Sequence, residues 1–159
     1  MTRTSHPDLE AAVDQTLAIV LDPKPLPEAR LLELVHALDR LALAVHPIDP
    51  NGSTEDIPGE AVQPVTRKQI AARFPMLGLY AVLIPPDPND SAEALVDPSS
   101  GIGDAIDDLL DIANDLCEAE WLRRNASRAA WVESVQFTFR THWGRHLRDL
   151  QGHLHDMAF

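Results

Sequence analysis

Cysteine is almost absent from this sequence, which has one, Cys117, among 159 residues. A single cysteine cannot form a disulfide within the chain, so the fold cannot depend on one. The first residues, Met1 to Pro7, lead into an amphipathic segment and lack the apolar stretch of a secretory signal. Together these features favour a cytoplasmic protein. Cys117 falls on the apolar flank of its predicted helix, which is typical of a buried, inert thiol.

Long apolar runs and basic residues are also scarce. No apolar run approaches the roughly 18 to 20 residues that span a bilayer, which excludes a membrane protein. The sequence has 13 Lys and Arg residues but 25 Asp and Glu residues, which gives a formal net charge of −12. Nucleic acid is therefore not an expected partner, because phosphate binding needs clustered basic residues. An acidic surface keeps a small domain in solution and can also attract a basic protein.

Apolar residues recur at three- and four-residue steps in segments separated by prolines, which predicts an all-α fold. A chain of 159 residues suits one domain with a buried core. We therefore expect a single helical domain, residues 1–159, built as a bundle of about five helices. The first three helices are expected at about Pro7 to Leu21, Glu28 to His46 and Val65 to Phe74.

Long proline-rich loops are expected at residues 48–64 and 85–100, where turn-forming residues replace any periodicity. The length of the first loop leaves open a role as a lid or a partner contact. Between the loops, the apolar run Leu77 to Ile84 fits either a buried strand or a helical turn. Because no second convincing strand is found, we expect this run to be helical or extended within an all-α domain.

The last third of the chain, residues 102–155, is predicted to form a helical hairpin. Its first helix is amphipathic, with seven acidic residues and no Lys or Arg between residues 101 and 120. Its second helix is expected from Arg128 to about His155. On a regular helical wheel, Trp143 and His146 lie on the apolar face of this second helix. The edge of that face carries His142, Asp149 and His153.

Two groups of polar residues in this hairpin are candidates for function. The first group begins the acidic helix and is expected to form a partner-binding surface. It consists of Asp104, Asp107 and Asp108. The second group is a polar cluster expected between the two helices. It consists of Asp111, Asp115, His142, Trp143 and His146.

A metal site is one interpretation of the histidines. Residues four apart on a helix point the same way, so His142 and His146 could bind one divalent transition-metal ion. His153, Asp149 or an aspartate of the facing helix could complete the ligand set, and the histidine candidates are His142, His146 and His153. The sequence has no Glu-x-x-His pair and no His-Glu-x-x-His motif. Hydrogen-bonded core histidines are the competing interpretation.

The sequence resembles a bacterial family of all-helical proteins of unknown function. In the C-terminal half the resemblance is carried by residues 111–116 (DIANDL), Trp131, Phe139, residues 142–146 (HWGRH) and residues 154–155 (LH). In the middle it is carried by Arg73, Phe74, Pro75, Leu77, Gly78 and Tyr80. The resemblance implies an all-helical fold and brings no activity, substrate or cofactor.

No catalytic residue can be assigned, because the sequence has no nucleophile elbow and no phosphate-binding glycine loop. We interpret the chain as a small acidic protein-interaction or regulatory module without a cofactor. Its partner would be a basic protein or a second copy, the latter through Phe137, which points away from the main apolar face. One alternative is a metal-binding protein or metal-dependent enzyme that uses the His/Asp cluster. Another is a metal-free enzyme that pairs Asp111 or Asp115 with His142 or His146 for acid–base catalysis.

Overall fold

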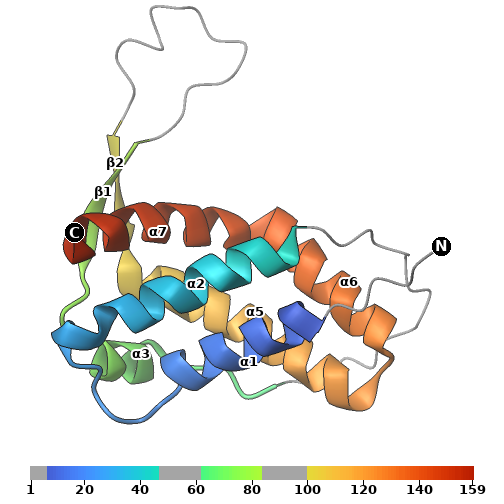
Figure 1. Ribbon diagram of the computed structural model, residues 1–159. Helices are drawn as coiled ribbons and strands as arrows, with labels where there is room; N and C mark the ends of the chain where they lie inside the picture. The colour runs from blue at the N-terminus through green and yellow to red at the C-terminus, as the bar shows by residue number, and fades with distance from the viewer. Residues whose placement is uncertain (1–6, 47–61, 84–99) are drawn as a thin grey trace, which may run out of the picture.

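Helices make up most of the protein, which confirms the mostly helical fold class. The computed structural model describes residues 7–46, 62–83 and 100–159, so the predicted loops 48–64 and 85–100 lie largely outside the described residues. A short 3-10 turn, η1 (Glu28–Arg30), leads into the second helix. The α-helices, shown in Figure 1, are α1 (Pro7–Val20), α2 (Leu31–Val45), α3 (Arg67–Arg73), α5 (Ala105–Asn125), α6 (Arg128–Thr138) and α7 (Gly144–Ala158).

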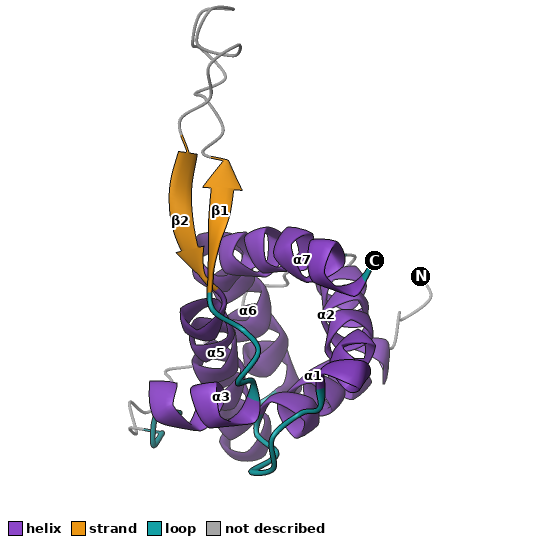
Figure 2. Ribbon diagram, turned by 90° about the vertical axis from the view of Figure 1, so that its left-hand side faces the viewer, coloured by secondary structure: helices purple, strands orange, loops and turns teal. Residues whose placement is uncertain are grey.

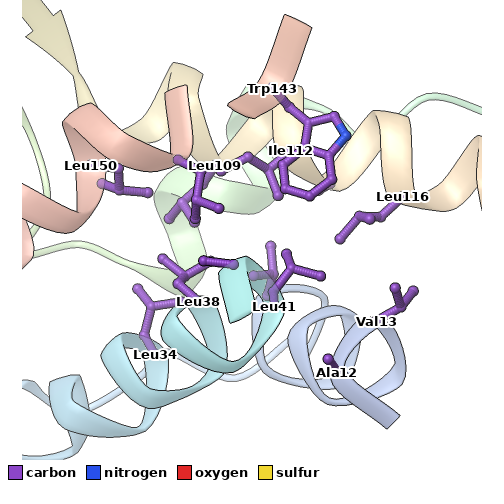
Figure 3. Packing of buried hydrophobic residues seen from close by; sticks show 14 of the residues in the cluster. Ala12, Val13, Leu34, Leu38, Leu41, Leu109, Ile112, Leu116, Trp143 and Leu150 are labelled. Atoms are coloured by element: carbon purple, nitrogen blue, oxygen red, sulfur yellow. The ribbon is translucent and has the colours of Figure 1, made fainter. Parts of the chain in front are cut away.

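The core lies between α1 and α2 on one side and α5 and α7 on the other. Leucines at three- and four-residue steps of α2 and apolar residues at similar steps of α5 point toward one another (Figure 3). Trp143 and Leu150 close the core from the α7 side and are both 0% exposed. Each such side chain contributes about 1.5–3 kcal/mol through removal of its apolar surface from water. No helix in the described parts of the chain is long and apolar enough to cross a membrane.

A π-helical turn, η2 (Phe139–Trp143), joins α6 to α7, so the long C-terminal helix is not regular. Its last hydrogen bond runs from the Gly144 N–H to the Phe139 carbonyl, five residues back. A Cβ atom on Gly144 would lie 2.1 Å from that carbonyl oxygen. Only glycine fits this position without a backbone shift. The close neighbour that excludes a side chain at Gly144 is thus the backbone of the same C-terminal helix.

A two-stranded antiparallel hairpin projects from the bundle beside α7 (Figures 1 and 2). It pairs β1 (Leu79–Leu83) with β2 (Ser100–Asp104), and Tyr80 lies opposite Gly103. The apolar run before residue 84 is therefore a strand. Its partner β2 also takes in residues 102–104, which we expected to begin the C-terminal helical hairpin, whereas α5 begins only at Ala105. The expectation of no second strand was wrong, and the predicted loop 85–100 ends one residue too late, because Ser100 begins β2.

The second strand runs directly into α5, which fixes the start of that helix. The Asp104 carboxylate caps the helix by accepting hydrogen bonds from the Ile106 and Asp107 N–H groups. The Ala105 N–H donates to the Gly78 carbonyl at 3.0 Å, which continues the contact between the two chain segments. The hairpin and the first turns of α5 are thus held together as one unit.

Candidate metal centre

Three aspartates of α5 face the C-terminal helix. Asp108, Asp111 and Asp115 are spaced at i, i+3 and i+7, so their side chains lie along one face of α5. This face packs against the π-helical turn and α7, which contribute His142 and His146. The site therefore brings together three carboxylates from α5 and two imidazoles, one from the π-helical turn and one from α7.

Asp108 holds His146. The His146 Nδ1 atom lies 2.7 Å from Asp108 Oδ1, and the Tyr80 hydroxyl donates to Asp108 Oδ2 at 2.5 Å. Asp108 is only 7% exposed. Burial raises the pKa of the Asp108 carboxyl above its ordinary value, and the hydrogen bonds from Tyr80 and His146 oppose that rise. Burial also raises the pKa of Tyr80, helped by its bond to Asp108, so the hydroxyl keeps its proton and donates it.

Asp115 holds His142 in the same way. The His142 Nδ1 atom lies 2.8 Å from Asp115 Oδ2. This hydrogen bond raises the pKa of His142 above its ordinary value. The His142 side chain is 49% exposed, whereas that of His146 is 33% exposed. The His142 ring is therefore the more accessible to solvent, and the His146 ring is the more buried.

Both histidines turn their second nitrogen toward Asp111. The Nε2 atoms of His146 and His142 lie 3.4 and 3.9 Å from the same oxygen, Asp111 Oδ2. The two rings stand edge to face with their centroids 5.4 Å apart. One ligand atom from each of these three residues lies within 4.8 Å of the other two. We refer to Asp111, His142 and His146 as the Asp–His–His triad.

The charges of the cluster do not balance by themselves. When both imidazoles are neutral, the carboxylates of Asp108, Asp111 and Asp115 carry three negative charges, and protonation of both rings still leaves one. Like charges on neighbouring turns of one helix repel each other. A bound divalent cation would remove most of this excess charge.

The structure brings together four of the five residues of the predicted polar cluster: Asp111, Asp115, His142 and His146. The fifth, Trp143, is 0% exposed in the core, where its Nε1–H donates to Thr138 Oγ1 at 2.9 Å. The placement of Trp143 in this cluster was wrong. The buried indole agrees with the apolar face on which the helical wheel places Trp143, so only its assignment to the polar cluster was at fault.

His153 also lies apart from the Asp–His–His triad, contrary to the ligand set expected for it. Its ring stacks on Tyr80 with the centroids 4.4 Å apart and the planes inclined by 6°. Beside this stack, a shallow cavity of about 520 Å³ lies between β1 and α7, and Asp149 lines part of it. Asp149 itself pairs with Arg145 at 3.0 Å. His153 therefore supports Tyr80 and is not placed to bind the same ion.

The three residues of the predicted partner surface do not form one exposed row. Asp104 and Asp107 both pair with Arg67 of α3, the first at 2.6 Å. Asp108 points inward to His146 and Tyr80. The motivation for this surface was a row of aspartates without neutralising partners, and each of the three has a partner here. Binding of a basic protein stays a prediction, as does self-association through Phe137, which is 64% exposed.

Sequence reasoning missed Asp108 and Tyr80 as members of this site. Asp108 stands three residues before Asp111, a spacing that places both on one helix face, and this signal was available. The contribution of Tyr80 depends on the pairing of two strands far apart in the sequence, and nothing local indicates it. Cys117 lies outside the site and is only partly buried, whereas a buried thiol was expected. Burial raises the pKa of its thiol, which lowers its reactivity.

The sequence matches no protein-family profile, no curated protein and no solved structure. The resemblance to a bacterial helical family therefore stays a prediction.

Proposed function

We propose that this protein binds one divalent transition-metal ion through Asp111, His142 and His146. One observation carries the proposal: the Nε2 atoms of both histidines face a single oxygen of Asp111, at 3.4 and 3.9 Å. Meanwhile the Nδ1 atom of each ring contacts a separate aspartate. Metal-binding histidines in proteins nearly always donate their other ring N–H to a carboxylate, a carbonyl or water. Both imidazoles have this arrangement.

The spacing of the ligand atoms suits an ion of ordinary size. Two atoms about 2.0–2.1 Å from a tetrahedral zinc ion lie about 3.3–3.4 Å apart. The His146–Asp111 separation of 3.4 Å already has this value, and the His142–Asp111 separation of 3.9 Å exceeds it by half an ångström. His142 is the most exposed of the three residues. The three ligand atoms lie within 4.8 Å of one another, so the His142 ring would move toward the other two residues to complete the geometry.

A purely structural clasp between α5 and α7 is the competing explanation. Exposed ion pairs contribute only about 0–1 kcal/mol, so a clasp gains little from a third carboxylate. Pairing each histidine with one aspartate would use Asp108 and Asp115 and would leave Asp111 unnecessary. Asp111 instead lies against both imidazoles and adds negative charge to an acidic cluster. A cation explains its position, and a clasp does not.

Two imidazoles and one carboxylate suit Zn²⁺, Fe²⁺ and their neighbours in the first transition row. Structural zinc sites have four protein ligands, whereas catalytic sites have three and leave a position for water or substrate. The described residues supply three ligands here, and the His142 side is open to solvent. The arrangement is therefore that of an accessible metal centre, where the ion could polarise a bound molecule or acidify bound water.

The Asp111→Asn variant tests this proposal. Loss of a residue that supports a ligand typically lowers metal affinity 10–100-fold, so loss of the ligand itself should lower zinc affinity at least about 100-fold. Asp107→Asn is the matched control, since it makes the same charge change one turn away, at a side chain that is 55% exposed and paired with Arg67. Calorimetric titration of the metal-free proteins with Zn²⁺ measures both.

One ion per chain in the wild type and in Asp107→Asn, with much weaker binding to Asp111→Asn, would support the site. Equal weakening in the two variants would indicate nonspecific attraction to acidic residues. If the wild type binds no zinc at all, the proposal fails outright.

A further inference from the structure

The hairpin that projects beside α7 contributes to the interior of the site through one side chain. Tyr80 stands on β1, and its hydroxyl reaches Asp108, whose other oxygen contacts His146 Nδ1. The chain of contacts therefore runs from the hairpin through a buried carboxylate to one of the two histidines. The second histidine, His142, has its own aspartate and no such connection.

We propose that the hairpin is a positioning element for His146, acting through Tyr80 and Asp108 to fix the orientation and tautomer of its ring. An ionised carboxylate only accepts hydrogen bonds, so His146 Nδ1 carries the proton and Nε2 presents its lone pair toward Asp111. The Tyr80 hydroxyl occupies the other oxygen of Asp108 and prevents the carboxylate from rotating. The inference about metal affinity rests on the proposed function, but the tautomer of His146 does not.

Gly103 supplies independent support for this role of the hairpin. It lies directly across the strand pair from Tyr80. A Cβ atom on Gly103 would lie 2.5 Å from Cζ of the Tyr80 ring and 2.8 Å from Cγ2 of Val82. Because Gly103 has no side chain, the Tyr80 ring can lie flat across the two paired strands. Glycines opposite aromatic residues commonly have this role in β-sheets.

His153 holds the opposite side of the same ring. The nearly parallel stack with Tyr80, with planes inclined by 6°, restricts the ring from the α7 side. The tyrosine is thus clamped between Gly103 of the hairpin and His153 of α7, with its hydroxyl directed at Asp108. A two-stranded hairpin is at most marginally stable alone, so these contacts with α7 and α5 also hold the hairpin in place.

The tautomer of His146 tests the inference in metal-free protein. Nitrogen-15 NMR of histidine-labelled protein, at a pH where the shifts show a neutral ring, distinguishes an Nδ1–H from an Nε2–H imidazole. We expect the Nδ1–H form for His146 in the wild type and a mixture of tautomers in Tyr80→Phe. Gly103→Ala should give the same mixture, because its Cβ would displace the Tyr80 ring.

Two control variants separate this effect from general damage. Leu79→Ala removes a side chain of the same strand that is 69% exposed, and it should leave His146 unchanged. Asp115→Asn should alter the tautomer of His142 and not that of His146. Zinc affinity should fall about tenfold in Tyr80→Phe and in Gly103→Ala, the lower end of the 10–100-fold range for residues that hold a ligand.

An Nε2–H tautomer of His146 in the wild type would overturn the inference. So would an unchanged His146 spectrum in both Tyr80→Phe and Gly103→Ala, even if the wild type binds zinc well. If the expected tautomer changes occur and the wild type binds no zinc, the positioning role stands and the proposed metal site fails. The two claims therefore fail separately.

Discussion

Replacement of both His142 and His146 by alanine is expected to abolish zinc binding. The two Nε2 atoms are the only nitrogen ligands in the Asp–His–His triad, and a single carboxylate binds a transition metal weakly at neutral pH. A ligand that binds only the folded state stabilises it by about 2.7 kcal/mol at a concentration of 100 times Kd. Zinc should therefore raise the thermal midpoint of the wild type and leave that of the double variant unchanged.

The control is the double variant His36→Ala with His155→Ala, which removes the same number of imidazoles from exposed positions of α2 and α7. It should respond to zinc as the wild type does. Removal of His146 leaves the buried Asp108 with one donor fewer, which costs about 1–3 kcal/mol in metal-free protein. Circular dichroism must therefore show that the site variant is folded. A zinc response that survives in the folded site variant would contradict the assignment.

Gly144→Ala is expected to lower the free energy of unfolding by about 1–3 kcal/mol, the range for an overpacked position. The new Cβ atom would lie 2.1 Å from the Phe139 carbonyl oxygen, and a backbone atom cannot move aside without opening the π-helical turn. That turn separates α6 from α7 and contains His142, while His146 follows it. Zinc affinity should fall as well, because the two histidines would no longer face Asp111 together.

Gly152→Ala is the matched control, since Gly152 lies in the same helix with no heavy atom within 4 Å of the added Cβ. Alanine is favoured over glycine in a helix by about 0.8–1.0 kcal/mol. The control should therefore be more stable than the wild type, with unchanged zinc affinity. Urea denaturation measures both variants. Stabilisation of similar size in Gly144→Ala would show that the turn is an ordinary α-helix in solution.

Helices could be predicted from the sequence because their signals are local. The recurrence of apolar residues in α1 and α2, and the cap residues Thr66 and Ser127 before α3 and α6, are all visible within a few positions. The strand β2 could not be predicted in this way. Its sequence, Ser-Gly-Ile-Gly-Asp, has weak strand propensity. A glycine is needed at position 103 because the Tyr80 ring lies against it on the paired strand. That contact joins residues far apart in the sequence, so local sequence does not reveal it.

The candidate site was predicted in part for the same reason. His142 and His146, four residues apart, and Asp111 and Asp115, on one face of α5, follow from helical spacing alone. The helical wheel placed Trp143 on the apolar face, and its side chain is buried in the core, so only its assignment to the polar cluster was wrong. His153 lies seven residues after His146 in the same helix, α7, about 10.5 Å farther along the axis, where it reaches Tyr80 and not the triad. Asp108 was taken for a surface residue because its burial depends on Tyr80, which arrives from the hairpin.

Diffraction data collected at the zinc absorption edge, from crystals grown with one equivalent of zinc, test the metal site most directly. The account predicts one anomalous peak about 2.0–2.2 Å from an Asp111 oxygen and the Nε2 atoms of His142 and His146. Asp108 and Asp115 should still contact the Nδ1 atoms. A zinc ion held instead by the Nδ1 atoms together with Asp108 or Asp115 would contradict the account. So would a peak only at Cys117 or elsewhere on the surface, or no peak.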